Sequence, residues 1–261
     1  MGLVSLRRPK HAPAAPASES PPQEEHEESA LSEPPAESFA PHTQLFSEKP
    51  KPLPVMLTTP IEGPAPSTKE KISLLAQMNR DEVSQCKKCR LCQTRTNTVF
   101  GEGDPDAKVF FIGEGPGETE DETGRPFVGK AGNLLNKMIA GMGLAREQVF
   151  IGNVVKCRPP GNRQPGPDEV AACTPYLVRQ LETIRPRVIV TLGLPASKYM
   201  LNSNETMGRM RGIWHEWRGI KLMPTYHPAY LLRSYTEENR AAVWSDLKKV
   251  MTELGLTVPK K

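Results

Sequence analysis

Residues 108–132 read KVFFIGEGPGETEDETGRPFVGKAG, and this stretch decides the fold. Its first five residues form an apolar run that predicts a buried strand, and a helical pattern begins near Ala131. The loop between them is rich in glycine. Glycines let a backbone approach a ligand closely, and a helix after such a loop directs free N–H groups back at it. The stretch therefore predicts a ligand site of the kind that many α/β proteins carry.

The same loop is also rich in acidic residues, namely Glu114, Glu118, Glu120 and Asp121. So much negative charge would repel a free phosphate, which carries the same sign. We therefore expect the loop to face a ligand of a different kind.

Further strands and helices alternate along the chain. Apolar runs predict strands over 148–155, 187–192 and 220–223, and helical spacing or start signals predict helices over 67–82, 133–142, 167–184, 195–201 and 237–254. Because parallel strands need helical crossovers, this alternation predicts an α/β fold, a three-layer α/β/α sandwich with a mainly parallel central sheet. Ligands of such sheets bind beyond the carboxyl ends of the strands. Residues 202–217 are expected to be irregular.

The N-terminal quarter of the chain has a different composition. Residues 1–67 hold 14 of the 27 prolines and no sustained apolar pattern. Such a segment buries too little apolar surface to offset its chain entropy, so we expect a disordered Pro/Glu-rich tail over 1–67 and a folded domain over 68–261. The tail has a formal net charge of −4, which leaves the folded part near +8. A basic domain suits an anionic polymer such as nucleic acid, although basic surfaces are common.

The sequence carries no signal for secretion or for a membrane. The start, MGLVSLRRPK, has two arginines but no apolar core behind it. No apolar run approaches the ~18 residues that a membrane span needs. We expect a soluble intracellular protein with no membrane partner.

Five cysteines indicate metal binding or catalysis rather than a disulfide framework. Cys86 and Cys89 form a CxxC pair, and Cys157 and Cys173 follow in a distant segment. Four thiolates of this kind suit zinc or a cubane iron–sulfur cluster, and the alternative is a set of ordinary buried thiols. Cys92 either replaces Cys89 as a ligand or is a reduced bystander.

Three motifs together carry a resemblance to a known family. They are the loop over 113–132, NVVKCRPPGNR over 153–163 and HPAYLLR over 227–233, and with them the chain resembles the family 4 (iron–sulfur) uracil-DNA glycosylases over about residues 70–255. The likeness implies a monofunctional enzyme that flips uracil out of DNA and hydrolyses its N-glycosidic bond, as in base excision repair. It also implies a monomer in the cytoplasm of a bacterium or archaeon, associated with the nucleoid, that acts on uracil in single- or double-stranded DNA.

The resemblance, and not the cysteine spacing, favours iron–sulfur over zinc. It implies a 4Fe–4S cluster with a structural role. Its ligands would be Cys86, Cys89, Cys157 and Cys173.

The resemblance also assigns residues around the base. Phe127 corresponds to the aromatic residue that stacks on uracil, Asn153 to the amide that reads its Watson–Crick edge, and His227 to the histidine near O2. Gly113 and Gly115 belong to the motif that forms the pocket wall. A fixed amide can donate to O4 of uracil and accept from N3–H, and the same geometry repels cytosine.

Catalytic roles are implied for His227, Glu114 and Glu120. A histidine that donates to O2 stabilises the departing uracil anion, and a carboxylate near the sugar stabilises the developing cation or positions water. We expect Glu114 before Glu120 in that role. The best-known uracil glycosylases carry an aspartate where this chain has Gly115, which leaves the choice between the glutamates open. Residues 161–167 lack the basic insertion of a relative that becomes trapped on DNA, so turnover without a stable adduct is expected.

Basic and apolar side chains near the expected site should hold DNA. The residues expected to contact phosphates are Arg158, Arg163, Arg211 and Arg233. Leu231 or Leu232 could wedge into the gap that a flipped base leaves, and the alternative for both is packing under the last helix.

Two other functions fit parts of the pattern. One is a non-catalytic or polymerase-associated DNA-binding module that keeps the fold and the cluster. The other is a zinc-stabilised α/β nucleotide-binding protein. Iron analysis tests the second alternative, and release of free uracil tests the first.

Overall fold

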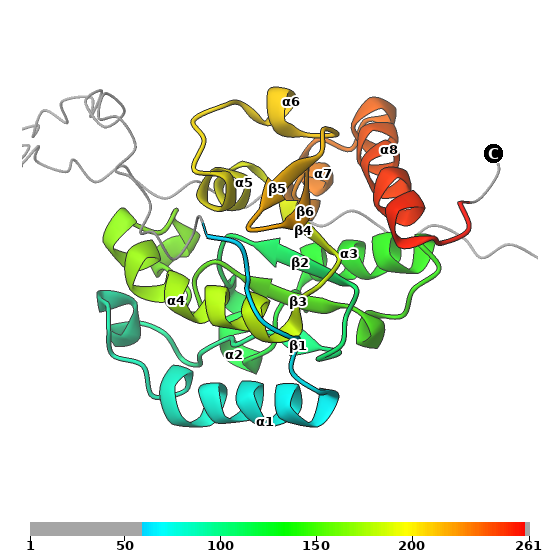
Figure 1. Cartoon of the computed structure of the whole chain (residues 1–261). Helices are drawn as coiled ribbons and strands as arrows, with labels where there is room; N and C mark the ends of the chain where they lie inside the picture. Colours follow the sequence, from blue (N-terminus) through cyan, green and yellow to red (C-terminus); the bar gives the residue numbers. More distant parts are fainter. Residues whose placement is uncertain (1–58, 259–261) are drawn as a thin grey trace, which may run out of the picture. The chain divides into compact units, whose positions relative to one another are not determined.

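The computed structural model describes residues 59–258, which lie in one unit of the chain, Glu48–Lys261 (Figure 1). Most of the tail expected to be disordered, residues 1–58, lies outside the described residues. Ser67 begins the first helix with a capping box, in which its hydroxyl accepts from the backbone of Glu70 and the Glu70 carboxylate accepts from the backbone of Ser67.

Six strands form the sheet, in the order β1-β3-β2-β4-β6-β5. The strands are β1 (Glu102–Gly103), β2 (Val109–Gly113), β3 (Phe150–Asn153), β4 (Val188–Leu192), β5 (His215–Trp217) and β6 (Ile220–Thr225). The four central strands pair in parallel, whereas the short edge strands β1 and β5 pair antiparallel with their neighbours. Both β2 and β4 are buried along their whole length, as expected for strands covered on two faces. The mainly parallel sheet predicted from the sequence is confirmed.

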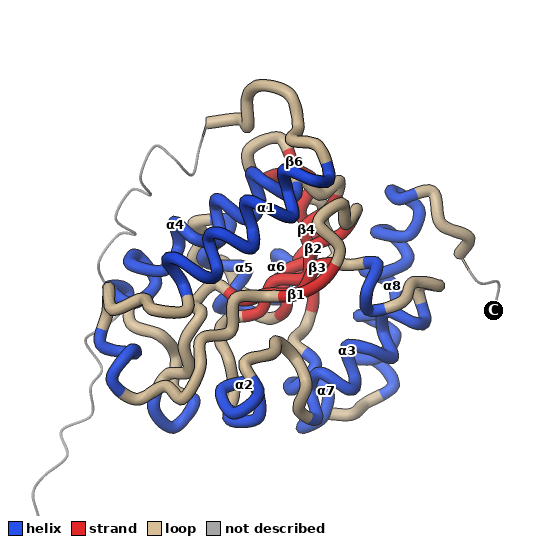
Figure 2. Tube along the Cα trace, turned by 90° about the horizontal axis from the view of Figure 1, so that it is seen from below, coloured by secondary structure: helices blue, strands red, loops and turns tan. Residues whose placement is uncertain are grey.

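Helices cover both faces of this sheet. They are α1 (Thr68–Met78), α2 (Glu118–Thr123), α3 (Lys130–Gly141), α4 (Pro167–Ile184), α5 (Leu194–Leu201), α6 (Met207–Met210), α7 (Pro228–Arg233) and α8 (Glu237–Leu254). One core lies between the sheet and α1, α4 and α5, and a second core joins the opposite face to α3, α7 and α8 (Figure 2). The three-layer α/β/α sandwich is therefore confirmed.

The longest helices begin and end where the sequence predicts. Helix α4 begins with Pro167 at its first position and acids in its first turn, and α8 ends at Gly255, whose φ of 72° is left-handed. The structure also contains elements that the sequence did not predict: α2 within the acidic loop, α6 and β5 within 202–217, α7 and β1. Each is six residues or shorter, which is too short for a periodic pattern to show. Among the described residues no helix is long and apolar enough to span a membrane.

Candidate functional site

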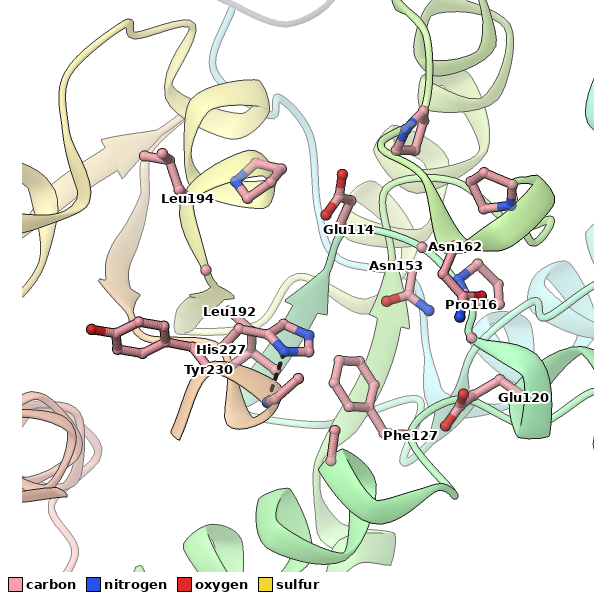
Figure 3. A pocket seen from close by; sticks show the side chains of 18 of the residues that line it. Glu114, Pro116, Glu120, Phe127, Asn153, Asn162, Leu192, Leu194, His227 and Tyr230 are labelled. Atoms are coloured by element: carbon pink, nitrogen blue, oxygen red, sulfur yellow. Dashed lines mark hydrogen bonds between the residues drawn. The ribbon is translucent and has the colours of Figure 1, made fainter. Parts of the chain in front are cut away.

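A pocket of about 760 Å³ opens at the carboxyl ends of the parallel strands. The loops after β2, β3 and β6 meet there, as predicted, and the turn after β4 at Gly193 adds a fourth wall. Figure 3 shows the side chains that line it, among them Glu114, Phe127, Asn153, Leu194, His227 and Tyr230. The sequence motifs that are far apart along the chain therefore share one cavity.

Asn153 is the last residue of β3 and lies beside Gly113, the last residue of β2. A Cβ atom on Gly113 would lie 2.4 Å from Asn153 Oδ1 and 2.6 Å from the Phe127 ring. Only glycine leaves room for the amide and the ring to come together here. Asn153 Oδ1 is buried and has no hydrogen-bond partner in the part of the chain that the structure describes, so it can accept from a ligand.

Phe127 forms the floor of the pocket. Its side chain is buried, and its ring centroid lies 5.6 Å from that of His227. Its φ of 51° is left-handed, which is unusual for an aromatic residue. Gly132 makes this backbone possible, because a Cβ atom there would lie 1.9 Å from the Phe127 carbonyl oxygen. The position of the Phe127 ring is thus set by its own left-handed backbone as well as by side-chain packing.

Glu120, on helix α2, supports the same turn. Its Oε1 atom accepts hydrogen bonds from the backbone N–H groups of Val128 and Gly129, each at 2.9 Å. It lines the pocket, but Figure 3 places it on the far side of Phe127 from His227. One of its two oxygens is therefore committed to the turn that carries the ring.

His227 caps the N-terminus of α7. Its Nδ1 accepts from the Ala229 N–H at 3.0 Å, so the neutral ring carries its proton on Nε2 (Figure 3). Burial, with a smaller contribution from Arg233, lowers the pKa of His227 to about 4. At neutral pH the side chain is an uncharged imidazole with an Nε2–H donor. Gly193 permits its position, since a Cβ atom there would lie 2.9 Å from His227 Cβ.

Glu114 directs a carboxyl group into the pocket from the loop after β2. Its Oε1 atom is buried without a partner, and burial raises the pKa of the group to about 7. The next residue, Gly115, lies close to Val155, whose methyl carbon would be 2.8 Å from an added Cβ. The loop therefore packs tightly on the segment that follows β3.

A second, smaller cavity lies behind the pocket, and four cysteines line it. They are Cys86, Cys89, Cys157 and Cys173, which the sequence grouped as one ligand set. Cys92 does not line this cavity, which fits the bystander role. Among residues 59–258 no three His, Cys, Asp or Glu side chains gather closely enough to hold one metal ion.

Three donors point at the sulfur atoms of this cavity. Arg95 donates to Cys157 Sγ at 3.0 Å, the Lys156 N–H donates to Cys173 Sγ at 3.2 Å, and the Tyr176 hydroxyl lies 3.5 Å from Cys86 Sγ. Burial raises the pKa of the Cys173 thiol to about 12, so a free thiol here stays protonated. Donors aimed at sulfur suit thiolates that are bound to iron.

The arginines predicted to bind phosphates differ in whether they are already paired with a buried carboxylate. Arg163 is paired with Glu169, whose side chain is 0% exposed, at 2.6 Å. Arg211 is paired with the buried Asp246 at 2.7 Å. Arg158 contacts Glu118 at 3.2 Å on the surface, and Arg233 lines the pocket. Arg158 and Arg233 are thus better placed to meet a phosphate than Arg163 and Arg211.

The two leucines of the HPAYLLR motif face in different directions. Leu231 is 3% exposed and packs in the core with α3 and α8, whereas Leu232 is 45% exposed. The core-packing alternative thus describes Leu231, and its burial does not fit the DNA contact predicted for it. The residues that sequence reasoning missed are Tyr230, Asn162 and Leu194, which line the pocket, and Lys156, which is buried beneath it. Tyr230 and Asn162 lie inside quoted motifs, so proximity to a motif was the available signal.

Comparison with known proteins gives a consistent result. The family model described as "Uracil DNA glycosylase superfamily" matches residues 100–248. The chain is 49% identical over 191 residues to the type-4 uracil-DNA glycosylase of Sulfurisphaera tokodaii, covering 70% of this chain and 85% of that protein. It is 48% identical over 184 residues to the type-4 enzyme of Saccharolobus solfataricus, covering 67% and 84%. The type-4 enzyme of Thermotoga maritima is 47% identical over 177 residues, covering 67% and 92%.

Proposed function

This chain belongs to the uracil-DNA glycosylase superfamily, and from that premise we propose that it flips uracil out of DNA and hydrolyses the bond between the base and deoxyribose. One observation carries the proposal at the site. The two buried oxygens without partners, Glu114 Oε1 and Asn153 Oδ1, both face a pocket whose floor is the Phe127 ring. An abasic site would remain, which is the substrate of base excision repair.

Asn153 reads the base in this proposal. Its Oδ1 accepts from N3–H of uracil, and its amide N–H donates to O4. Cytosine presents a bare N3 and an amino group at these positions, so in a buried site the Asn153 oxygen would face an acceptor and its N–H would face a donor. Such a mismatch in hydrogen bonding reduces the rate by several powers of ten. Phe127 stacks on the flipped base and recovers ~1–3 kcal/mol of the cost of flipping.

His227 stabilises the departing uracil. As the glycosidic bond breaks, negative charge gathers on the base, and we assign the Nε2–H donor of His227 to O2. The lowered pKa matters here, because the ring donates as a neutral group and its proton is not lost to the leaving group.

Glu114 acts at the sugar. The buried Oε1 atom of Glu114 accepts no hydrogen bond from the described residues. The carboxylate is therefore available to stabilise the oxocarbenium-like sugar and to hold the attacking water. Glu120 has one oxygen bound to two backbone N–H groups, so we assign it to the positioning of Phe127. The hydrolytic role therefore falls to Glu114.

The four cysteines would hold a 4Fe–4S cluster. Their sulfurs come from separate segments around one cavity, spread wider than the ligands of a single ion, and three donors point at them. When bound, the cluster supplies a cross-link between these segments and no step of the hydrolysis.

We place DNA across the mouth of the pocket, with Arg158 and Arg233 at phosphates. Leu232 and Tyr230 are exposed beside it, at 45% and 38%, and take the place of Leu231 as candidates for the wedge. A wedge fills the gap in a base stack, so it matters for duplex and not for single strands. Leu232→Ala should lower uracil release from duplex a few-fold and leave single-strand release unchanged.

A uracil-release assay tests the function. Purified protein is incubated with a labelled oligonucleotide that contains one uracil, without added metal or nucleotide, and abasic sites are cut with alkali. We expect cleavage at uracil in single and double strands and none in matched strands that carry cytosine or thymine. Absence of free uracil at every salt concentration would contradict the proposal, and equal binding of uracil-containing and ordinary duplex would then indicate a non-catalytic DNA-binding module.

A further inference from the structure

We infer that Lys156 is a positioning residue that fixes the base-reading Asn153 and connects it to the cysteine cavity. The inference rests on the proposed function, because Asn153 has a base to read only if uracil enters the pocket. It concerns a residue that touches neither the base nor the sugar.

The ammonium group of Lys156 binds the main chain beneath the reading amide. The side chain is 1% exposed, and Nζ donates to the Asn153 carbonyl oxygen at 2.9 Å and to Gln180 Oε1 at 2.6 Å. Asn153 is the last residue of β3, and the N–H groups of Val154 and Val155 after it still donate to the Gly113 and Glu114 carbonyls at 2.9 and 3.1 Å. Lys156 adds a side-chain donor to the Asn153 carbonyl itself.

The other contacts of Lys156 fix the lysine itself. Gln180, on α4, donates through Nε2 to the Phe100 carbonyl at 2.9 Å, which sets the orientation of its amide. The Lys156 carbonyl accepts from the Val99 N–H at 2.8 Å, and the Lys156 N–H donates to Cys173 Sγ at 3.2 Å. One residue thus contacts the strand end of the pocket and a sulfur of the cysteine cavity.

The reading amide depends on this support. Asn153 Oδ1 has no partner within residues 59–258, so no polar contact from this part of the chain holds that oxygen before a base arrives. Its direction is set by packing against Gly113 and Phe127 and by the main chain that Lys156 holds. A shift of about 1 Å in a positioning group can cost about a hundredfold in rate.

An ordinary structural role would not require a lysine here. Within residues 59–258 no carboxylate is paired with Lys156, and its ammonium group binds two neutral oxygens, the Asn153 carbonyl and Gln180 Oε1. Burying an ammonium group without a carboxylate is costly, and an apolar side chain of similar volume would often serve packing as well. The feature that methionine cannot supply is the pair of hydrogen bonds to Asn153 and Gln180.

The test is Lys156→Met in the full-length, cluster-loaded protein. We expect kcat for uracil release to fall about tenfold to a hundredfold. The affinity for free uracil, measured by calorimetry, should fall by a similar factor. KM for DNA, which reflects phosphate contacts, should change less than about twofold, and iron content should not change.

Lys71→Met is the matched control. Lys71 is also a buried lysine, 7% exposed, and donates to the Ile184 carbonyl at 3.0 Å, but it lies on α1 and does not line the pocket. Its loss should lower the melting temperature and leave kcat and uracil affinity unchanged. In an Asn153→Ala background, Lys156→Met should lower the rate less than about twofold further, because the amide that it positions is gone. Equal losses in the control, or independent losses in the double variant, would overturn the inference.

Gln180→Leu covers the case in which Lys156→Met does not fold. It removes one partner of Nζ and should lower kcat and uracil affinity a few-fold, again with KM for DNA unchanged. A misfolded Lys156→Met protein together with full activity and full uracil affinity in Gln180→Leu would also overturn the inference. If wild-type protein binds free uracil but releases no uracil from DNA, only the proposed function is contradicted. The affinities of the wild type and Lys156→Met for free uracil then still test the role of Lys156.

Discussion

The base pocket and the cysteine cavity share the segment 153–157, yet they treat buried polar atoms in opposite ways. In the pocket, Glu114 Oε1 and Asn153 Oδ1 have no partner among the described residues. In the cavity, Cys157 and Cys173 each receive an N–H donor. Buried polar atoms are normally paired, so the two unpaired oxygens suit a ligand that comes and goes, whereas the paired sulfurs are satisfied within the protein, as the structural cluster proposed above would require.

The largest effect should come from the cysteine cavity. Cys157→Ser removes one proposed cluster ligand, so the segments around the cavity lose their cross-link. We expect loss of iron and of the brown colour, with a free energy of unfolding lower by at least ~3 kcal/mol. Iron analysis and thermal melting measure this. Cys92→Ser, outside the cavity, is the control and should keep its iron, whereas full iron in Cys157→Ser would exclude the proposed ligand set.

Removal of the Asn153 or His227 side chain should slow uracil release and leave the cysteine cavity intact. Asn153→Ala and His227→Ala should each slow uracil release about a hundredfold to a thousandfold, because each removes a donor or acceptor aimed at the base. Single-turnover rates on a uracil-containing oligonucleotide measure this. His215→Ala, which lies on β5 away from the pocket, is the control. If Asn153→Ala or His227→Ala has an unchanged rate, or has lost iron, the base pocket and the cysteine cavity do not have the separate roles proposed for them.

Gly113→Ala tests whether the pocket depends on close approach. The added Cβ would lie 2.4 Å from Asn153 Oδ1, so the amide or the Phe127 ring must move. We expect kcat/KM to fall about tenfold to a hundredfold. Gly208→Ala is the control, because nothing lies within 4 Å of its added Cβ. Equal rates for the two variants would show that the amide and ring tolerate displacement.

The smallest effect is a dependence on pH. Glu114 must be ionised to stabilise the sugar cation, so kcat/KM should rise about tenfold per pH unit below its pKa of about 7 and level off above it. Glu114→Gln should be slower and should lose this rise. The same raised pKa means that the folded protein binds this proton more tightly than the unfolded chain, so the group's contribution to stability falls as pH rises from 4.5 through 7.

His227 acts in the opposite direction on stability. Its folded pKa of about 4 lies below the ordinary value of 6.5, so its contribution falls as pH drops from 6.5 toward 4. Thermal melts of the wild type and of Glu114→Gln across pH 4–8 would separate the two contributions. If kcat/KM of Glu114→Gln rises with pH as steeply as that of the wild type, another group causes the pH dependence of the rate.

The sequence predicted those elements whose ends or periodicity are marked by residues within the element itself. Helices α4 and α8 lie where the sequence predicted them, since proline and acids mark the start of α4 and a glycine follows α8. The edge strands β1 and β5, of two and three residues, have no period to detect. In the site, motifs brought Phe127, Asn153 and His227 into one pocket.

What the sequence could not provide depends on tertiary contacts. The bond between Glu120 and the turn after Phe127 spans eight residues, and nothing in the acidic loop distinguishes Glu120 from Glu118 beforehand. Leu231 and Leu232 are chemically identical neighbours, and only the direction of α7 places one in the core. A lysine is expected at the surface, and Lys156 is buried where its ammonium group binds Gln180 of α4 and the Asn153 carbonyl.

The left-handed backbone of Phe127 has a consequence for the timing of recognition. Such a conformation costs ~1–3 kcal/mol and persists only where its surroundings enforce it; here Glu120 holds the turn through two backbone N–H groups, and Gly132 leaves room for it. The stacking surface therefore exists before DNA arrives, and binding need not spend ordering entropy to build it. The backbone amides of Val128 and Gly129 become natural reporters of this readiness: they should exchange slowly with deuterated solvent in the free protein. Fast exchange at both, slowed only by uracil, would show instead that the base itself assembles its platform.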